Sequence, residues 1–159
     1  MFDDPKRDGW QKPHEVIQAL ALKPDATVAD IGAGTGYFSV RLAHRVPKGK
    51  VYAVDLEPDM VRHLAARAKR EQLPNVLAVQ AAPDDPRLPQ KVDLVLLVDT
   101  YHHLGDPVRY FSALKQGLAP QGRVAPPRHF PGRALARLHA AGAFAKLPGC
   151  DSSFSSPLR

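Results

Sequence analysis

Cysteine is almost absent from the 159 residues, and the single Cys150 excludes both an internal disulfide and a metal site built from cysteines. No apolar run is long enough to span a membrane. The acidic start, residues 1–5, lacks the apolar core of a signal peptide, so we expect a cytoplasmic protein. The seven histidines show no paired helical spacing that demands a metal. We therefore predict no metal and no membrane association.

Strand-forming residues are missing from one part of the chain. Residues 126–159 contain no valine, isoleucine, threonine, tyrosine or tryptophan. They also carry most of the net charge of +6, because they contain five basic residues and a single acidic residue, Asp151. A nucleic-acid surface is one interpretation of this basic segment. We favour a solvated or disordered end, since no interleaved aromatic residues accompany the charge, and we do not expect a nucleic-acid partner.

The rest of the composition is that of a globular protein. Hydrophobic residues make up 44% of the chain, the mean hydropathy is −0.28, and the length suits one domain with a moderate core. Proline, glycine and acidic residues divide the sequence into alternating strands and helices. We predict helices from Pro13, after Gly36, from Pro58 and from Pro107, the last capped by Asp106. Strands are predicted to end at residues 31, 56, 80 and 99, with a weak fifth strand over 117–125.

A glycine-rich loop follows the first of these strands. The sequence from residue 27 to residue 37 reads Thr-Val-Ala-Asp-Ile-Gly-Ala-Gly-Thr-Gly-Tyr. A strand, a glycine turn and a helix in succession build a nucleotide site at the carboxyl edge of a parallel sheet. A dinucleotide fingerprint needs its third glycine where this chain has Tyr37, and Asp30 would repel a pyrophosphate. A cofactor with an ammonium group and a carboxylate fits better, with Asp30 serving the ammonium directly or through water.

Residues 30–36, Asp-Ile-Gly-Ala-Gly-Thr-Gly, resemble the first motif of the class I S-adenosylmethionine-dependent methyltransferases of small-molecule type. The resemblance covers about residues 8–125. It implies a Rossmann-like, doubly wound parallel α/β sheet, S-adenosylmethionine as cofactor, and methyl transfer to an unidentified small-molecule substrate. The cofactor-binding residues that it implies in this loop are Asp30, Gly32, Ala33, Gly34 and Gly36.

Asp55 is the carboxylate near the end of the second predicted strand, over residues 50–56, and stands 19 residues after Gly36. An acid about 20 residues past the glycine loop binds the ribose hydroxyls in nucleotide-binding sheets. Nicotinamide-dependent enzymes and methyltransferases both place an acid here, so Asp55 supports a nucleotide without choosing between the two. The other interpretation is a surface carboxylate at a strand end. Leu56, the next residue, joins the predicted cofactor site.

The third and fourth strand ends are less regular. The family usually has a Gly-Asp pair after the third strand, whose acid accepts from the adenine amino group, but Ala82 stands in that place. We predict that Asp84 or the backbone replaces it. Asp99, at the end of the apolar strand 91–99, is the last predicted cofactor-binding residue.

The loop after the fourth strand carries the candidate catalytic residues, His102 and His103. Either imidazole could act as a general base on a hydroxyl or thiol, or have a structural or capping role. The Asn/Asp-Pro-Pro-aromatic pattern of nucleobase and amide methyltransferases is missing, which weakens a DNA-base interpretation. Near the start of the chain, Trp10 is either part of a lid over the cofactor or an anchor for the N-terminal arm.

The resemblance stops where Pro126 and Pro127 follow the weak fifth strand. We expect a methyltransferase domain over 1–125, an atypical tail rich in proline, arginine and alanine over 126–159, and no final antiparallel strands. The open sheet edge would then permit self-association. A reading-frame shift and a natural truncation are both open as explanations. Three other functions also stay open: a cofactor-binding remnant without turnover, a nicotinamide-dependent oxidoreductase and a non-enzymatic interaction module.

Overall fold

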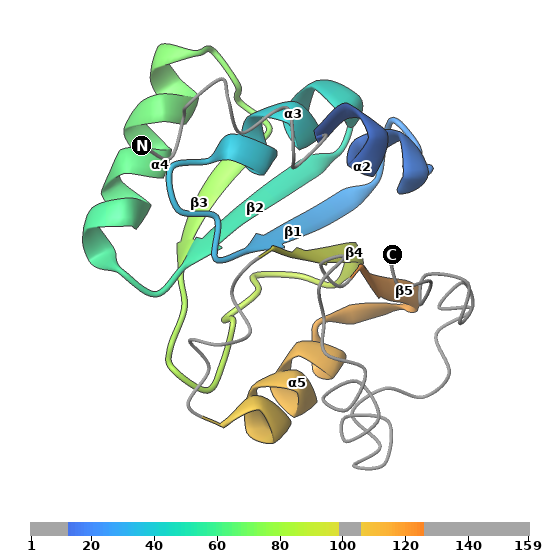
Figure 1. The fold of residues 1–159 in the computed structure, drawn as a ribbon, viewed down its shortest axis with the longest axis vertical. Helices are drawn as coiled ribbons and strands as arrows, with labels where there is room; N and C mark the ends of the chain where they lie inside the picture. The colour runs from blue at the N-terminus through green and yellow to red at the C-terminus, as the bar shows by residue number, and fades with distance from the viewer. Residues whose placement is uncertain (1–12, 99–105, 126–159) are drawn as a thin grey trace, which may run out of the picture.

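A computed structural model describes residues 13–98 and 106–125, and these form a parallel sheet with helices on both faces (Figure 1). The strand order is β3-β2-β1-β4-β5, and every neighbouring pair runs parallel. The strands are β1 (Thr27–Ile31), β2 (Lys50–Asp55), β3 (Val76–Gln80), β4 (Val92–Leu97) and β5 (Leu118–Ala125). The helices are α2 (Pro13–Ala19), α3 (Tyr37–Arg45), α4 (Pro58–Arg70) and α5 (Pro107–Gln116). The predicted doubly wound sheet is therefore confirmed for these residues.

The centre of the sheet is formed by β1, β2 and β4, whose residues are almost continuously buried. A strand covered on both faces needs apolar side chains at successive positions rather than in alternation. Val28 lies opposite Val51 on one side and Leu94 on the other, and all three are fully or almost fully buried. This pairing fixes the register of β1, and with it the position of the glycine loop that follows.

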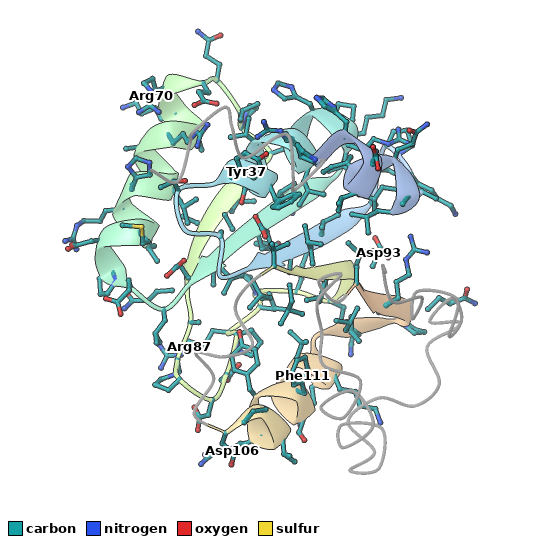
Figure 2. All side chains as sticks on the ribbon, viewed as in Figure 1. Tyr37, Arg70, Arg87, Asp93, Asp106 and Phe111 are labelled. Carbon is teal, nitrogen blue, oxygen red and sulfur yellow. The ribbon has the colours of Figure 1, made fainter. Side chains whose placement is uncertain are left out.

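Two layers of side chains hold the helices to the sheet. On one face, Phe38 and Leu42 of α3 pack with Val28 and Leu94. On the other face, Phe111 and its neighbours on α5 pack against residues of β1, β2 and β4. The labelled side chains Tyr37 and Phe111 accordingly lie on opposite sides of the sheet (Figure 2).

The helices begin where proline and acidic residues predict. Pro58 and Pro107 occupy first-turn positions of α4 and α5, where a missing N–H costs nothing. The side chain of Asp106 accepts a hydrogen bond from the backbone N–H of Arg109 at 3.1 Å, so the predicted cap is confirmed. Pro13 is the first residue of α2, as expected.

The weak fifth strand does form, but it pairs irregularly with β4. Val92 pairs with Leu118 and Leu94 with Arg123, so several residues of β5 face a much shorter piece of β4. A Cβ on Gly122 would lie 2.7 Å from the Val92 carbonyl oxygen, which explains the glycine at this bend. Pro120 is tolerated because, among the described residues, no strand pairs with the outer edge of β5.

Two features of the described residues bear on function. No helix in residues 13–98 and 106–125 is long and apolar enough to cross a membrane. The same residues contain no group of three histidine, cysteine, aspartate or glutamate side chains arranged to hold a metal. The expectations for Trp10, for the tail over 126–159 and for the final antiparallel strands lie outside the described residues.

Candidate cofactor site

The glycine loop is attached to the end of β2. The backbone N–H groups of Gly32 and Ala33 both donate to the carbonyl oxygen of Val54, at 2.8 and 3.0 Å. Because β1 and β2 are parallel neighbours, their carboxyl ends meet at one edge of the sheet. The predicted loop residues and Asp55 are therefore brought together, as nucleotide binding requires.

All three glycines of the loop have backbone angles that favour glycine. Gly32 has φ +71°, Gly34 has φ +54° and Gly36 has φ +89°, in the left-handed region that residues other than glycine rarely adopt. The surroundings of Gly34 and Gly36 differ. A Cβ on Gly36 would meet Leu64 Cδ2 at 3.0 Å, whereas a Cβ on Gly34 would meet no atom within 4 Å. Gly36 thus faces α4, and Gly34 leaves open space where a ligand can approach the backbone.

Asp55 is held by backbone amides from two loops. Its Oδ2 accepts from the N–H of Gly34 at 2.8 Å, and its Oδ1 accepts from the N–H of Glu57 at 3.0 Å. A carboxylate has about four acceptor positions, so hydroxyl groups of a ribose can still donate to these oxygens. Asp55 is part-buried and Leu56 beside it is 44% exposed, which leaves an apolar side chain beside the carboxylate for a base to pack on.

Asp30 is the buried charge of the site. The residue is 3% exposed, and its carboxylate accepts a hydrogen bond from Ser39 Oγ at 2.6 Å. Desolvation by burial raises the pKa of Asp30 from 3.8 to about 6, the Ser39 hydroxyl and backbone N–H lower it, and the charge of Asp55 raises it. Ser39 lies in the first turn of α3, where Gly36 provides no side-chain cap. Asp30 therefore supplies an acceptor to this helix N-terminus from the neighbouring strand.

The segment after β3 folds into a tight turn. Ala82 and Asp85 exchange backbone hydrogen bonds, and the N–H of Arg87 donates to Asp85 Oδ1 at 2.7 Å. Asp84, the predicted adenine partner, forms an ion pair with Arg109 of α5, with 2.9 Å between Oδ2 and Nε. The N–H of Ala82 therefore already has an acceptor within the turn, the carbonyl oxygen of Asp85. The carboxylate of Asp84 is already paired with a cation of α5.

Sequence reasoning missed two residues at this site, Ser39 and Arg67. Arg67 of α4 donates from Nη1 to the carbonyl oxygen of Thr35 at 2.8 Å. In the sequence, Ser39 could have been noticed as a small polar residue between Phe38 and Val40 in the first turn of α3. Arg67 could have been noticed as a cation between Leu64 and Ala68, the buried residues of α4. Asp99, His102 and His103 lie outside the described residues, so their predicted roles stay predictions.

The chemistry of these residues fits a nucleoside that carries a positive charge. Asp55 offers acceptors for hydroxyl groups, and Asp30 offers a second carboxylate in the same loop region. A Cβ on Gly34, whose N–H donates to Asp55, would meet no atom within 4 Å, so there is space for a ligand beside this bond. A pyrophosphate would face two carboxylates here, and that arrangement disfavours a dinucleotide.

The sequence model of a family described as methyltransferase domain matches residues 28–122, which is more than half of the chain. The chain belongs to this family. A crystal structure of an S-adenosylmethionine-dependent methyltransferase from Aquifex aeolicus superimposes with a TM-score of 0.81 at 27% identity, over 89% of this chain and 84% of that one. The predicted family, the Rossmann-like fold and S-adenosylmethionine as the cofactor are confirmed.

Curated relatives are similar over part of their length. Trans-aconitate 2-methyltransferase of Deinococcus radiodurans is 32% identical over 120 residues, which are 75% of this chain and 44% of that protein. Malonyl-acyl carrier protein O-methyltransferase 1 of Ilyobacter polytropus is 28% identical over 103 residues, which are 65% of this chain and 38% of that protein. The chain thus spans less than half the length of these two relatives.

Proposed function

We propose that this protein transfers the methyl group of S-adenosylmethionine to a small-molecule acceptor. The observation that carries the proposal is Asp55, whose two oxygens are fixed by the amides of Gly34 and Glu57 at the end of β2. A sulfonium cofactor supplies an activated methyl group, so the protein has mainly to bind it and align the acceptor.

The described residues have three tasks in this function. Asp55 accepts hydrogen bonds from the ribose hydroxyls, and its position does not depend on the ligand because backbone amides already hold it. Asp30 provides negative charge toward the ammonium group of the cofactor. Gly34 allows the ligand to approach the backbone closely. His102 or His103 is proposed to receive the proton of a hydroxyl or thiol acceptor where the acceptor has one.

A carboxylic acid is the acceptor class that we favour. Two relatives are named for malonyl-acyl carrier protein and trans-aconitate, and they match 65% and 75% of this chain. A carboxylate is ionised at neutral pH, so its methylation needs alignment but no general base. Such a product is a methyl ester.

Isothermal titration of the full chain with S-adenosylhomocysteine and, separately, with NADH tests the cofactor. We expect binding of the first and none of the second, and the reverse would favour an oxidoreductase. Radiolabelled S-adenosylmethionine with a panel of small carboxylic acids then tests the reaction. Mild alkali releases volatile methanol from a methyl ester but not from methyl ethers or from N-, S- or C-methyl products, so it shows whether a carboxylate was the acceptor.

Cofactor binding without turnover is the second candidate. This chain matches only 38% and 44% of the length of two relatives, and that observation favours the second candidate. Residues that hold the acceptor in those proteins can lie in the part that this chain does not match. Binding of S-adenosylhomocysteine with no label transferred to any acceptor would support this candidate.

A further inference from the structure

A continuous series of hydrogen bonds joins α4 to Asp55 through the backbone of the glycine loop. Arg67 Nη1 donates to the Thr35 carbonyl oxygen at 2.8 Å, and the N–H of the same peptide unit, on Gly36, donates to the Ala33 carbonyl oxygen at 2.8 Å. The N–H of that second peptide unit, on Gly34, donates to Asp55 Oδ2 at 2.8 Å. A guanidinium and a carboxylate thus stand at the two ends of two aligned peptide groups.

The direction of this series matters physically. Both peptide dipoles point their oxygen toward Arg67 and their N–H toward Asp55, so each charge polarises the bonds between them in the same sense. Hydrogen bonds to charged groups are also stronger than those between neutral groups. Removing the positive end should therefore weaken the bond at Gly34, although two peptide units lie between Arg67 and Asp55 in this series.

Arg67 is itself held in place. Its side chain is 15% exposed, and its Nε donates to Glu71 Oε1 at 2.8 Å one helical turn further along α4. The aliphatic part lies against the loop, because a Cβ on Gly36 would be 3.7 Å from Arg67 Cδ. The neighbouring Leu64 is 2% exposed and packs with Ala33. Helix α4 therefore supports the loop by apolar packing as well as by the guanidinium.

We propose that Arg67 is a positioning residue for cofactor binding, which acts through the peptide units Thr35–Gly36 and Ala33–Gly34 to fix Asp55. This inference rests on the proposed function of Asp55 as the ribose-binding carboxylate. Arg67 keeps both peptide planes in the orientation that presents the Gly34 N–H to Asp55, so the site is already formed when the cofactor arrives.

The first experiment compares Arg67→Met with Arg62→Met in the full chain. Arg62 lies on the same helix and also forms an ion pair, with Asp59, but its side chain is 72% exposed, whereas that of Arg67 is 15% exposed. Isothermal titration should show the dissociation constant of S-adenosylhomocysteine rising about tenfold in Arg67→Met, the loss of one charge-assisted hydrogen bond. Arg62→Met should bind like the wild type.

A double-mutant cycle tests whether Arg67 acts through Asp55. With Asp55→Ala in the background, Arg67→Met should weaken binding by less than twofold, because the end point of the series is gone. A tenfold loss in both backgrounds would overturn the proposal, since it would mean that Arg67 acts independently of Asp55. Equal affinity of Arg67→Met and wild type would overturn it as well.

Hydrogen exchange separates positioning from general stability. Arg67→Met should increase exchange at the Gly34 and Gly36 amides while leaving the amides of β1 and β2 protected, and Arg62→Met should change neither. Uniformly faster exchange over the whole domain would contradict the proposal. If Arg67→Met does not fold, Arg67→Lys and Glu71→Gln keep the test open, with smaller losses of affinity expected from both. Failure of the wild type to bind S-adenosylhomocysteine would instead refute the proposed function.

Discussion

Ser39 donates its hydroxyl hydrogen to the buried carboxylate of Asp30, with 2.6 Å between Oγ and Oδ2. The bond joins β1 to the first turn of α3 beneath the glycine loop. It offsets only part of the cost of burying a charge, since burial still raises the pKa of Asp30 to about 6. A buried carboxylate that lowers the stability of the folded protein is expected where its charge contributes to ligand binding.

Asp30→Asn should make the unliganded protein more stable near neutral pH. The folded-state pKa of about 6 lies above the value of 3.8 for a free carboxyl, so the native state binds more protons between these two values. The contribution of Asp30 to the free energy of unfolding therefore falls as pH rises through this window, by about 3 kcal/mol in total. Urea unfolding at pH 4 and pH 7.5 checks this.

The gain of Asp30→Asn over the wild type should be small at pH 4 and reach about 2–3 kcal/mol at pH 7.5. The same variant should bind S-adenosylhomocysteine more weakly at pH 7.5, because the ammonium group of the ligand loses its counter-charge. A variant that is more stable and binds equally well would remove Asp30 from the cofactor site.

Affinity for S-adenosylhomocysteine should rise with pH in the wild type. A cationic ligand group favours the ionised carboxylate, so binding should strengthen between pH 5 and pH 7 as Asp30 loses its proton near its pKa of about 6. Ser39→Ala removes a hydrogen bond that lowers this pKa, and the midpoint of the profile should therefore move to higher pH. Titration calorimetry across pH 5–8 measures both profiles. A flat wild-type profile, or the same midpoint in the two proteins, would contradict the assignment.

The elements of this fold could be predicted because local signals mark their ends. Pro58, Pro107 and Asp106 start helices through backbone restrictions that act within a few residues. The apolar run over β4 indicates a strand buried on both faces without knowledge of its partners. The second strand was predicted in the same way over residues 50–56, and β2 ends one residue earlier, at Asp55.

The contacts that complete the site could not be predicted, because they join distant parts of the sequence. Arg67 and Thr35 are 32 residues apart and meet only after α4 has packed against the loop. The ion pair of Asp84 with Arg109 depends in the same way on where α5 lies relative to the turn after β3. The sequence offered Asp84 as a nearby acid in place of Ala82, but only the fold shows that Asp84 already forms an ion pair with Arg109.

Asp55→Ala should weaken binding of S-adenosylhomocysteine by about 1–3 kcal/mol, because the ribose hydroxyls lose a charged acceptor. Asp93→Ala is the matched control. Asp93 also accepts a backbone hydrogen bond, from Thr27 at 2.8 Å, but it lies near the amino ends of the strands (Figure 2). Calorimetry should therefore show unchanged affinity for Asp93→Ala. An unchanged dissociation constant in folded Asp55→Ala would exclude Asp55 from the site.

Self-association should increase with protein concentration, because no described strand pairs with the outer edge of β5. Sedimentation velocity over a hundredfold range of concentration checks this through the weight-average sedimentation coefficient. A monodisperse monomer throughout the range would show that the edge is protected.

Gly34→Val should abolish cofactor binding while leaving most of the fold intact. A Cβ at this position would meet no protein atom within 4 Å, so the side chain projects into the space that we assign to the ligand. Valine is also strained at φ +54°, and that strain alone could disturb the loop. Gly34→Asn separates the two effects, because asparagine tolerates the left-handed region much better than valine but is still bulky. Loss of S-adenosylhomocysteine binding in both variants, with thermal unfolding close to wild type for Gly34→Asn, would mean that bulk blocks the ligand. Recovery of full affinity in Gly34→Asn would instead mean that Gly34 is needed only for the turn.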